Sequence, residues 1–229
     1  MAAKILWPWE LPEVLDGVTV VADVWVATAN ITSFLRKGVK KLLIVNKDNV
    51  QKAKGEYKDA LIIGESLELP ISFFDASNFP SEIEKKDIEN RTILYMSNNG
   101  SRIIELALKK KAKEVITVSF TNIAVISEYL RNLKQNIYFI AAGEIQGADR
   151  KAHEDLICIE SLDKMLKGQN VDLNKAKEWA KSYIVANHKY KSSEQDLRLV
   201  FHLNSSKAIP LCSKEKEGWI KVGDLNKLA

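Results

Sequence analysis

Short apolar runs of strand length recur along the chain, and segments with helical periodicity separate them. The apolar runs lie at 18–24, 41–46, 60–65, 92–97, 114–119 and 137–143. Buried strands that alternate with helices are typical of βαβ units and of a mainly parallel sheet with helices on both faces. We therefore predict an α/β fold, a three-layer α/β/α domain that spans residues 1–229.

The two ends of the chain depart from this alternation. Residues 1–17 contain Trp and Pro in a pattern typical of an N-terminal arm packed on the domain. After about residue 170, two helical segments at 172–188 and 192–204 precede a β-hairpin at 208–223. This region is too short to bury a large core alone. We predict that residues 170–229 form a small helical and hairpin cap on the sheet.

Composition excludes several classes of protein. The 229 residues are 46% hydrophobic, and 34 basic against 30 acidic residues give a net charge of +4. The basic excess is mostly Lys spread along helices, without an Arg-rich segment, so a nucleic-acid partner is not expected. No uninterrupted apolar stretch reaches the length of about 18 residues that a membrane span needs.

The redox state and location follow from the cysteines and the N-terminus. Cys158 and Cys212 lie in apolar surroundings, and the N-terminus lacks the apolar centre of a secretory signal. We expect both cysteines to be reduced core residues and the protein to be cytoplasmic. Homo-oligomerisation stays open.

Polar residues stand where the predicted strands end. In open α/β sheets, ligands bind beyond the carboxyl ends of the strands. The segments at or between those ends are Asp23, Gly64–Glu65, 73–80, 97–101, 119–122 and 141–147. Each of them alone is also explained as a cap, a turn or a loop. Together, on one edge of one sheet, they favour a binding site.

The residue types at these strand ends indicate an anion and a metal ion. Asn and Ser at helix N-termini suit an anion, because free backbone N–H groups point there. Carboxylates next to an anion repel it unless a cation such as Mg²⁺ bridges them. We therefore expect a small phosphorylated molecule held through Mg²⁺. Zinc spacing, a phosphate loop, a nucleophile elbow and a dinucleotide fingerprint do not occur in the sequence.

The order of these segments resembles the 2-phosphosulfolactate phosphatase family of coenzyme M biosynthesis. That family has a D-V-L-R-A-T/S-T motif, then G-E-R, F-D-x-G-N-S-P, T-T-N-G-T, S-F-x-N, C-A-G-x-x-G and E-D. The matching segments here are DVWVATA (23–29), GES (64–66), FDASNFP (74–80), MSNNGS (96–101), SFTN (119–122), AAGEIQG (141–147) and HED (153–155). The resemblance implies a Mg²⁺-dependent hydrolase, a phosphatase that acts on a phosphorylated, sulfonated hydroxy acid.

Carried over position by position, the resemblance implies roles for individual residues. The matching positions are Asp23, Glu65, Asp75, Asn78, Asn99, Gly100, Asn122, Gly143, Glu154 and Asp155. In the implied mechanism Asp23, Glu65 and Asp155 hold the metal, and Glu154 acts as proton donor or acceptor beside Asp23 and Asp155. The expected substrate-binding residues are Thr28, Asn78, Asn99, Gly100, Arg102, Asn122 and Gly143.

Three positions depart from the family pattern. Val26 and Ser66 replace arginines, and Ala141 replaces the cysteine of C-A-G. Arginine is the natural bidentate partner of phosphate or sulfonate, so the chain lacks two expected donors. Arg102, Arg150 and Lys151 are expected near the same edge as substitutes. Three alternatives stay open: a phosphatase with the family substrate, a phosphatase with another substrate, and a non-catalytic relative that binds a small anion.

Overall fold

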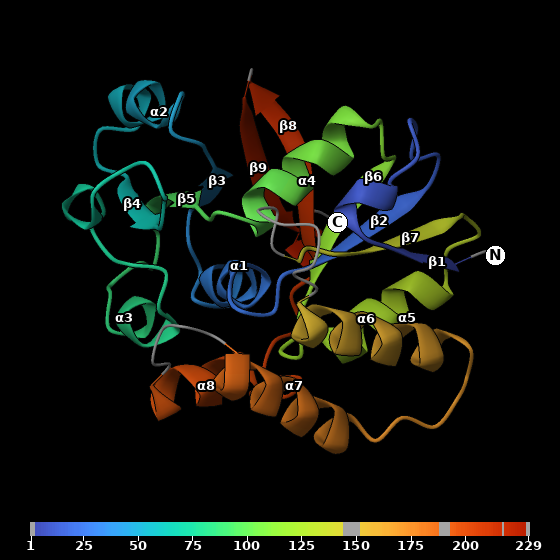
Figure 1. Ribbon diagram of the computed structural model, residues 1–229. Helices are drawn as coiled ribbons and strands as arrows, with labels where there is room; N and C mark the ends of the chain where they lie inside the picture. The colour runs from blue at the N-terminus through green and yellow to red at the C-terminus, as the bar shows by residue number, and fades with distance from the viewer. Residues whose placement is uncertain (1–2, 144–151, 188–192, 217, 228–229) are drawn as a thin grey trace.

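The protein is described by a computed structural model that covers residues 3–143, 152–187, 193–216 and 218–227 (Figure 1). The strands are β1 (Ala3–Leu6), β2 (Val18–Ala22), β3 (Lys41–Ile44), β4 (Leu61–Gly64), β5 (Thr92–Met96), β6 (Glu114–Val118), β7 (Ile137–Ala141), β8 (Pro210–Lys216) and β9 (Trp219–Asp224). The helices are α1 (Ala27–Arg36), α2 (Val50–Glu56), α3 (Pro80–Glu84), α4 (Gly100–Lys109), α5 (Ile123–Arg131), α6 (His153–Leu166), α7 (Leu173–Asn187) and α8 (Glu194–Val200). Short 3₁₀ turns occupy Pro8–Glu10, Ile71–Phe73 and Leu225–Lys227.

The nine strands form one sheet in the order β1-β7-β2-β6-β8-β9-β3-β5-β4. The predicted α/β class is confirmed, and each predicted apolar run contains a strand. β2 shows why these runs are almost purely apolar. Val18 and Val20 face a core shared with α5 and α6, whereas Val21 faces a core shared with α1 and α4. A strand buried on both faces favours apolar side chains, and Thr19 is the one polar residue of β2.

Helices cover the sheet on both sides. α1 and α4 pack over β2, β6 and β8, while α5 and α6 pack on the opposite face and α7 lies outside α6. α2 covers the β3–β5 part of the sheet together with Trp219. Within the described ranges, none of the helices combines the length and the apolar character needed to cross a bilayer. Cys158 and Cys212 are buried free thiols, as predicted.

The sheet consists of two parallel groups that run in opposite senses. β1, β7, β2 and β6 are parallel to one another, and so are β3, β5 and β4. Between them, β6–β8, β8–β9 and β9–β3 are three successive antiparallel pairings. Because the number of antiparallel pairings between the groups is odd, the strands of the second group run opposite to those of the first. In Figure 1 the two groups lie on either side of β8 and β9, with α1 and α4 between them.

The C-terminal hairpin and the N-terminal arm therefore differ from the prediction. The hairpin forms as β8 and β9, but it lies in the middle of the sheet and not on top of it. Cys212, Ile220 and Val222 are at most 5% exposed, because helices cover them as they cover the other central strands. Only α7 and α8 remain outside the sheet as a cover. The N-terminal arm contributes the edge strand β1, which pairs with β7.

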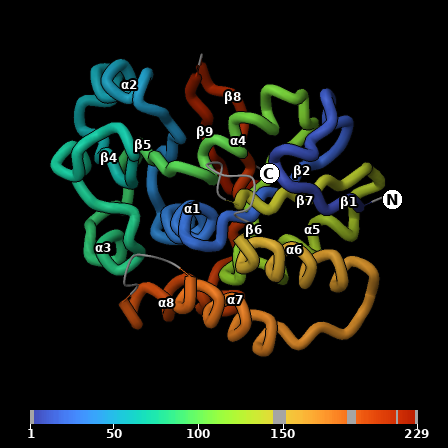
Figure 2. The backbone as a smooth tube through the Cα atoms, in the orientation of Figure 1, coloured from blue at the N-terminus to red at the C-terminus, as the bar shows by residue number. Residues whose placement is uncertain are grey.

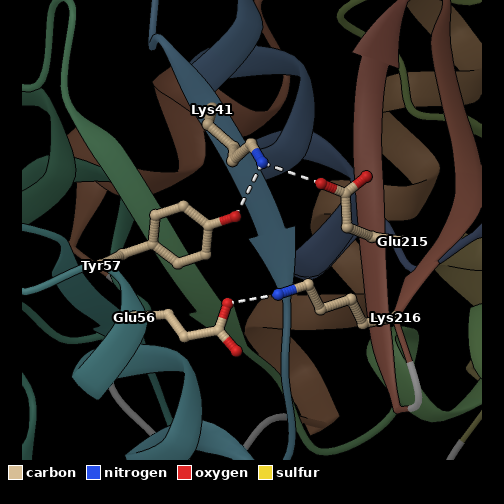
Figure 3. Close-up of polar contacts among 5 residues, drawn as sticks. All are labelled: Lys41, Glu56, Tyr57, Glu215 and Lys216. Atoms are coloured by element: carbon tan, nitrogen blue, oxygen red, sulfur yellow. Dashed lines mark hydrogen bonds and ion pairs between the residues drawn. The ribbon is translucent and has the colours of Figure 1, made fainter.

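Side chains at the far end of the hairpin tie it to the second group (Figure 3). Lys41 of β3 donates hydrogen bonds of 2.8 Å to Glu215 of β8 and to the hydroxyl of Tyr57. Lys216 makes an ion pair of 2.5 Å with Glu56 of α2. The tube in Figure 2 shows the same arrangement, with β8 and β9 beside β3. These contacts fix the hairpin against β3, where only three residue pairs form the ladder.

We expect the Lys41–Glu215 pair to stabilise the fold measurably. A double-mutant cycle with Lys41→Met and Glu215→Gln should give a coupling energy of about 0.5–1 kcal/mol by urea unfolding, since both side chains are only 26% exposed. The matched control is the ion pair Lys47–Glu68, whose side chains are 47% and 56% exposed. Its coupling should be close to zero. Equal coupling in the two pairs would contradict a tethering role for Lys41.

Candidate functional site

Asp23 follows β2 directly and lies at the N-terminus of α1. The Thr28 hydroxyl and the Thr28 N–H both donate to the backbone carbonyl of Asp23, at 2.8 and 2.9 Å. The Ala27 N–H points at Oδ1 of Asp23, 3.4 Å away. The loop between strand and helix is thus closed by its own polar groups. Thr28, predicted to bind substrate, is fully buried and uses its hydroxyl to hold this loop.

The N-terminus of α4 meets the same carboxylate. The Gly100 N–H donates to the Asp23 side chain. A Cβ atom at position 100 would lie 2.7 Å from Oδ2 of Asp23 and 2.6 Å from Cβ of Ala27. Only glycine permits this approach, because real Cβ atoms do not come so close to other heavy atoms. The match between Gly100 and the family glycine therefore has a steric reason.

This contact corrects the expected arrangement of the site. Asp23 follows β2 and Gly100 follows β5, and these strands belong to groups of opposite sense. The candidate residues therefore do not stand along one edge of a parallel sheet. They stand at the carboxyl ends of two groups that face each other across α1 and α4. The packing of α4, which starts at Gly100, on β2 brings the two ends together.

Burial and neighbouring charges set the protonation of Asp23. The residue is 6% exposed. Burial, together with the negative charges of Glu65 and Glu154, raises the pKa of Asp23 to about 7, although the hydrogen bonds from the N–H groups of Ala27 and Gly100 oppose the rise. A carboxyl group whose pKa is raised to near 7 by burial and by other carboxylates destabilises the fold when it is ionised. Groups with such perturbed pKa values cluster at functional sites.

Glu65 follows β4 on the second group and faces Asp23. The residue itself is exposed at the rim, and its carboxylate interacts with Asn98 and with the side chain of Asn78. Partial removal from water raises the pKa of Glu65, and these hydrogen bonds lower it. Asp23 and Glu65 thus bring two carboxyl groups together from opposite halves of the sheet.

A buried polar cluster behind Asn78 was missed by the sequence analysis. The Asn30 side-chain amide donates to the backbone carbonyl of Asn78 at 2.9 Å and to its Oδ1 at 3.0 Å. The Tyr95 hydroxyl donates to the same Oδ1 at 2.6 Å. Asn30 and Tyr95 are at most 1% exposed. The available signal was a polar residue on the apolar face of the helix at 27–36, which the pattern analysis did not use.

Asp155 and Glu154 lie in the first turn of α6. Oδ1 of Asp155 accepts the Val24 N–H at 2.7 Å, and Oδ2 accepts the Gly143 N–H at 3.2 Å. Asp155 therefore links the loops that follow β2 and β7, and both of its oxygens have backbone partners. Burial and the charges of Glu154 and Asp23 raise the pKa of Asp155. Glu154 is 2% exposed, and its charge acts on both aspartates.

The remaining predicted residues differ in where the structure places them. Asn122 is fully buried, and its amide hydrogens are both donated to backbone carbonyls, those of Thr117 and Ala208. Asn99 is half-buried at the N-cap of α4. Arg102 is exposed on α4 and lines a groove of about 240 Å³ with Pro8. Arg150 and Lys151 lie outside the described residues.

The three departures from the family pattern are accommodated within the protein. Val26 is 7% exposed and packs in the apolar core between β2 and α5. The Ser66 hydroxyl accepts the Glu68 N–H at 3.1 Å within its own loop. Ala141 is fully buried as the last residue of β7. A guanidinium at position 26 would therefore have to displace apolar side chains.

The donor set of the described residues is compatible with Mg²⁺. In the part of the chain that the structure describes, no group of three or more His, Cys, Asp or Glu residues is placed to hold a metal ion. Mg²⁺ needs fewer protein ligands, because it keeps several waters and is bound through one or two carboxylates plus substrate phosphate. Asp23 and Glu65 offer two such carboxylates, and Asp23 and Asp155 each also accept two backbone N–H groups.

Comparisons with known proteins point to one family. A family model described as 2-phosphosulpholactate phosphatase matches residues 6–217. A protein of Clostridium perfringens strain SM101, named "Probable 2-phosphosulfolactate phosphatase", is 30% identical over 189 residues, which is 80% of this chain and 72% of the relative. A Thermotoga petrophila protein with the same name is 27% identical over 199 residues, 86% of this chain and 84% of the relative.

Other matches are shorter. A Clostridium perfringens strain 13 protein of the same name is 34% identical over 139 residues. The aligned part is 57% of this chain, and it spans just over half the length, 55%, of that relative.

Proposed function

This chain belongs to the 2-phosphosulfolactate phosphatase family, and we propose that it hydrolyses the phosphate monoester of a small hydroxy acid with Mg²⁺ as cofactor. The observation that carries the proposal is the environment of Asp23. This carboxyl is buried, has a pKa raised to about 7, and lies beside two other acidic residues and two helix N-termini. Such a cluster is costly unless a cation and an anionic substrate complete it.

In the proposed mechanism, residues from both halves of the sheet act together. Asp23 and Glu65 would hold Mg²⁺, which polarises the phosphoryl group and lowers the pKa of a bound water. The Asn78 amide would neutralise charge on the phosphoryl oxygens. Glu154 would accept the proton of the attacking water. Asp155 would keep the loops after β2 and β7 at a fixed separation.

A second candidate is a relative that binds a small anion without turnover. It is favoured by the two missing arginines, since Val26 is packed in the core and Ser66 bonds within its own loop. Two charge-assisted donors to a doubly anionic substrate are then absent. A phosphatase with a less anionic substrate fits the same observation.

Hydrolysis of a panel of phosphate monoesters tests the proposal. The panel begins with 2-phosphosulfolactate and continues with phosphorylated hydroxy acids that lack the sulfonate. Each ester is assayed with Mg²⁺ and with EDTA. We expect release of phosphate from at least one ester, abolished by EDTA. Binding of inorganic phosphate in calorimetry without hydrolysis of any ester would contradict turnover and support the anion-binding relative.

A further inference from the structure

The Asn78 side chain can take two orientations that differ by exchange of its oxygen and its NH₂ group. Two donors select between them here. Oδ1 accepts from the Asn30 amide and from the Tyr95 hydroxyl, at 3.0 and 2.6 Å. With Oδ1 fixed on that side, the NH₂ group must point to the other side, where Glu65 lies. The hydrogen-bond network therefore assigns the amide, as such assignments require.

We propose that Asn30 and Tyr95 are positioning residues, which hold the Asn78 amide with its NH₂ group toward the Glu65 carboxylate. The inference rests on the proposed function for its catalytic meaning, but the orientation itself does not depend on that function. The reversed amide would place an oxygen against the carboxylate, and the lost hydrogen bond would become a repulsion. Glu65 would then keep only its hydrogen bonds to Asn98, and its direction toward Asp23 would be less well fixed.

The cluster is built to keep this orientation. The three side chains are at most 7% exposed, so water does not compete for Oδ1. The Tyr95 hydroxyl also accepts a 3.4 Å bond from Asn30, so the two donors support one another. The Tyr95 ring packs edge-on against Phe34, with ring centroids 5.2 Å apart. Burial raises the pKa of Tyr95 well above its usual value, so the hydroxyl keeps its proton and remains a donor.

The two donors are redundant, and this gives the inference a sharp test. In Asn30→Ala or in Tyr95→Phe one donor still selects the orientation, so Mg²⁺ affinity should fall about two- to threefold. In the double variant only the contact with Glu65 still selects it, and affinity should fall at least tenfold, more than the product of the two single effects. Calorimetry with Mg²⁺ alone measures this, and urea unfolding of each variant measures stability separately. A purely structural role predicts additive losses of stability and unchanged affinity.

A spectroscopic readout does not require a metal or turnover. The Asn78 NH₂ protons are identified by NMR as the pair of signals that disappears in Asn78→Asp. We expect this pair to be protected and dispersed in the wild type and in both single variants, and averaged in the double variant. The control variants are Tyr129→Phe, which removes a 2.6 Å hydroxyl bond to Glu114, and Asn132→Ala, which removes a surface amide bond to Glu128. They should leave the Asn78 signals and Mg²⁺ affinity unchanged.

The outcomes separate this inference from the proposed function. Unchanged Asn78 signals in the double variant would overturn the inference, and so would released signals with wild-type Mg²⁺ affinity. If the wild-type protein hydrolyses no ester while the NMR result is as expected, the proposed function fails and the positioning role of Asn30 and Tyr95 stands.

Discussion

Replacing Asp23 with Asn is expected to abolish Mg²⁺-dependent hydrolysis and, at the same time, to stabilise the protein above neutral pH. The substitution keeps the shape of the side chain and removes a buried charge that two other carboxylates repel. We expect at least a 100-fold loss of kcat/KM and at least a tenfold loss of Mg²⁺ affinity, because one of two carboxylate ligands is gone.

The stability effect has a definite pH dependence. The folded pKa of Asp23 is about 7, above the ordinary value of 3.8, so between these values the folded protein holds a proton that the unfolded chain has released. Stability is therefore greatest at low pH within this window and declines as the pH rises toward 7. The penalty at pH 8 is roughly 2–4 kcal/mol. Asp23→Asn should remove most of it, and should show little gain at pH 4.

Urea unfolding in EDTA at pH 4 and pH 8 measures this effect, and Asp48→Asn in an exposed loop is the matched control. The control variant should change neither the activity nor the dependence of the unfolding free energy on pH. Saturating Mg²⁺ should restore stability to the wild type at pH 8, but not to Asp23→Asn, since a ligand stabilises only the state that binds it. If the unfolding free energy depends on pH equally in the wild type and in Asp23→Asn, Asp23 is not the origin of the loss of stability at pH 8.

Gly100→Ala should be a strongly damaging substitution, although it replaces only a single hydrogen by a methyl group. The new Cβ atom would lie 2.7 Å from Oδ2 of Asp23 and 2.6 Å from Cβ of Ala27, so α4 has to move away from α1. Overpacking of this kind costs about 1–3 kcal/mol. We expect the catalytic loss to be larger in proportion, at least 100-fold in kcat/KM, because a displacement of about 1 Å suffices for that.

The control for Gly100→Ala is Gly55→Ala in α2. A Cβ atom at position 55 has nothing within 4 Å, so the helix should gain about 0.5–1 kcal/mol and activity should not change. Thermal unfolding and steady-state kinetics of the two variants provide the comparison. Wild-type activity in Gly100→Ala would mean that the close approach of α4 to Asp23 has no role in catalysis.

The strands and helices were predictable from the sequence, but the order of the strands was not. Apolar runs such as 18–24 specify buried strands wherever they pair. The direction of β3, β5 and β4 relative to β2 depends on which strands the hairpin β8–β9 joins, and the alternation of polar and apolar residues contains no information on that choice. An expectation based on one parallel sheet therefore placed the site residues on a single edge.

The candidate site was predictable where charge is unusual for its position, as at Asp23. The site was less predictable where a polar side chain forms hydrogen bonds with the protein's own backbone. Thr28 and Asn122 have the residue types of ligand donors, but their polar groups bond within the protein. Asn30 and Tyr95 were overlooked for the opposite reason, since they lie within apolar patterns that indicate core.

The central position of β8 and β9 has a consequence for folding during synthesis. β6 and β3 are joined through a hairpin that follows them in the chain by about 90 and 170 residues. Pairings of such long sequence separation form late and slowly, because loop closure costs entropy before contacts compensate it. On a ribosome, β2 and β5 can each find their parallel neighbours early, yet the sheet joins the two groups only when residues 210–224 emerge. The sheet thus connects Glu65 of the second group to the carboxylates of the first group last.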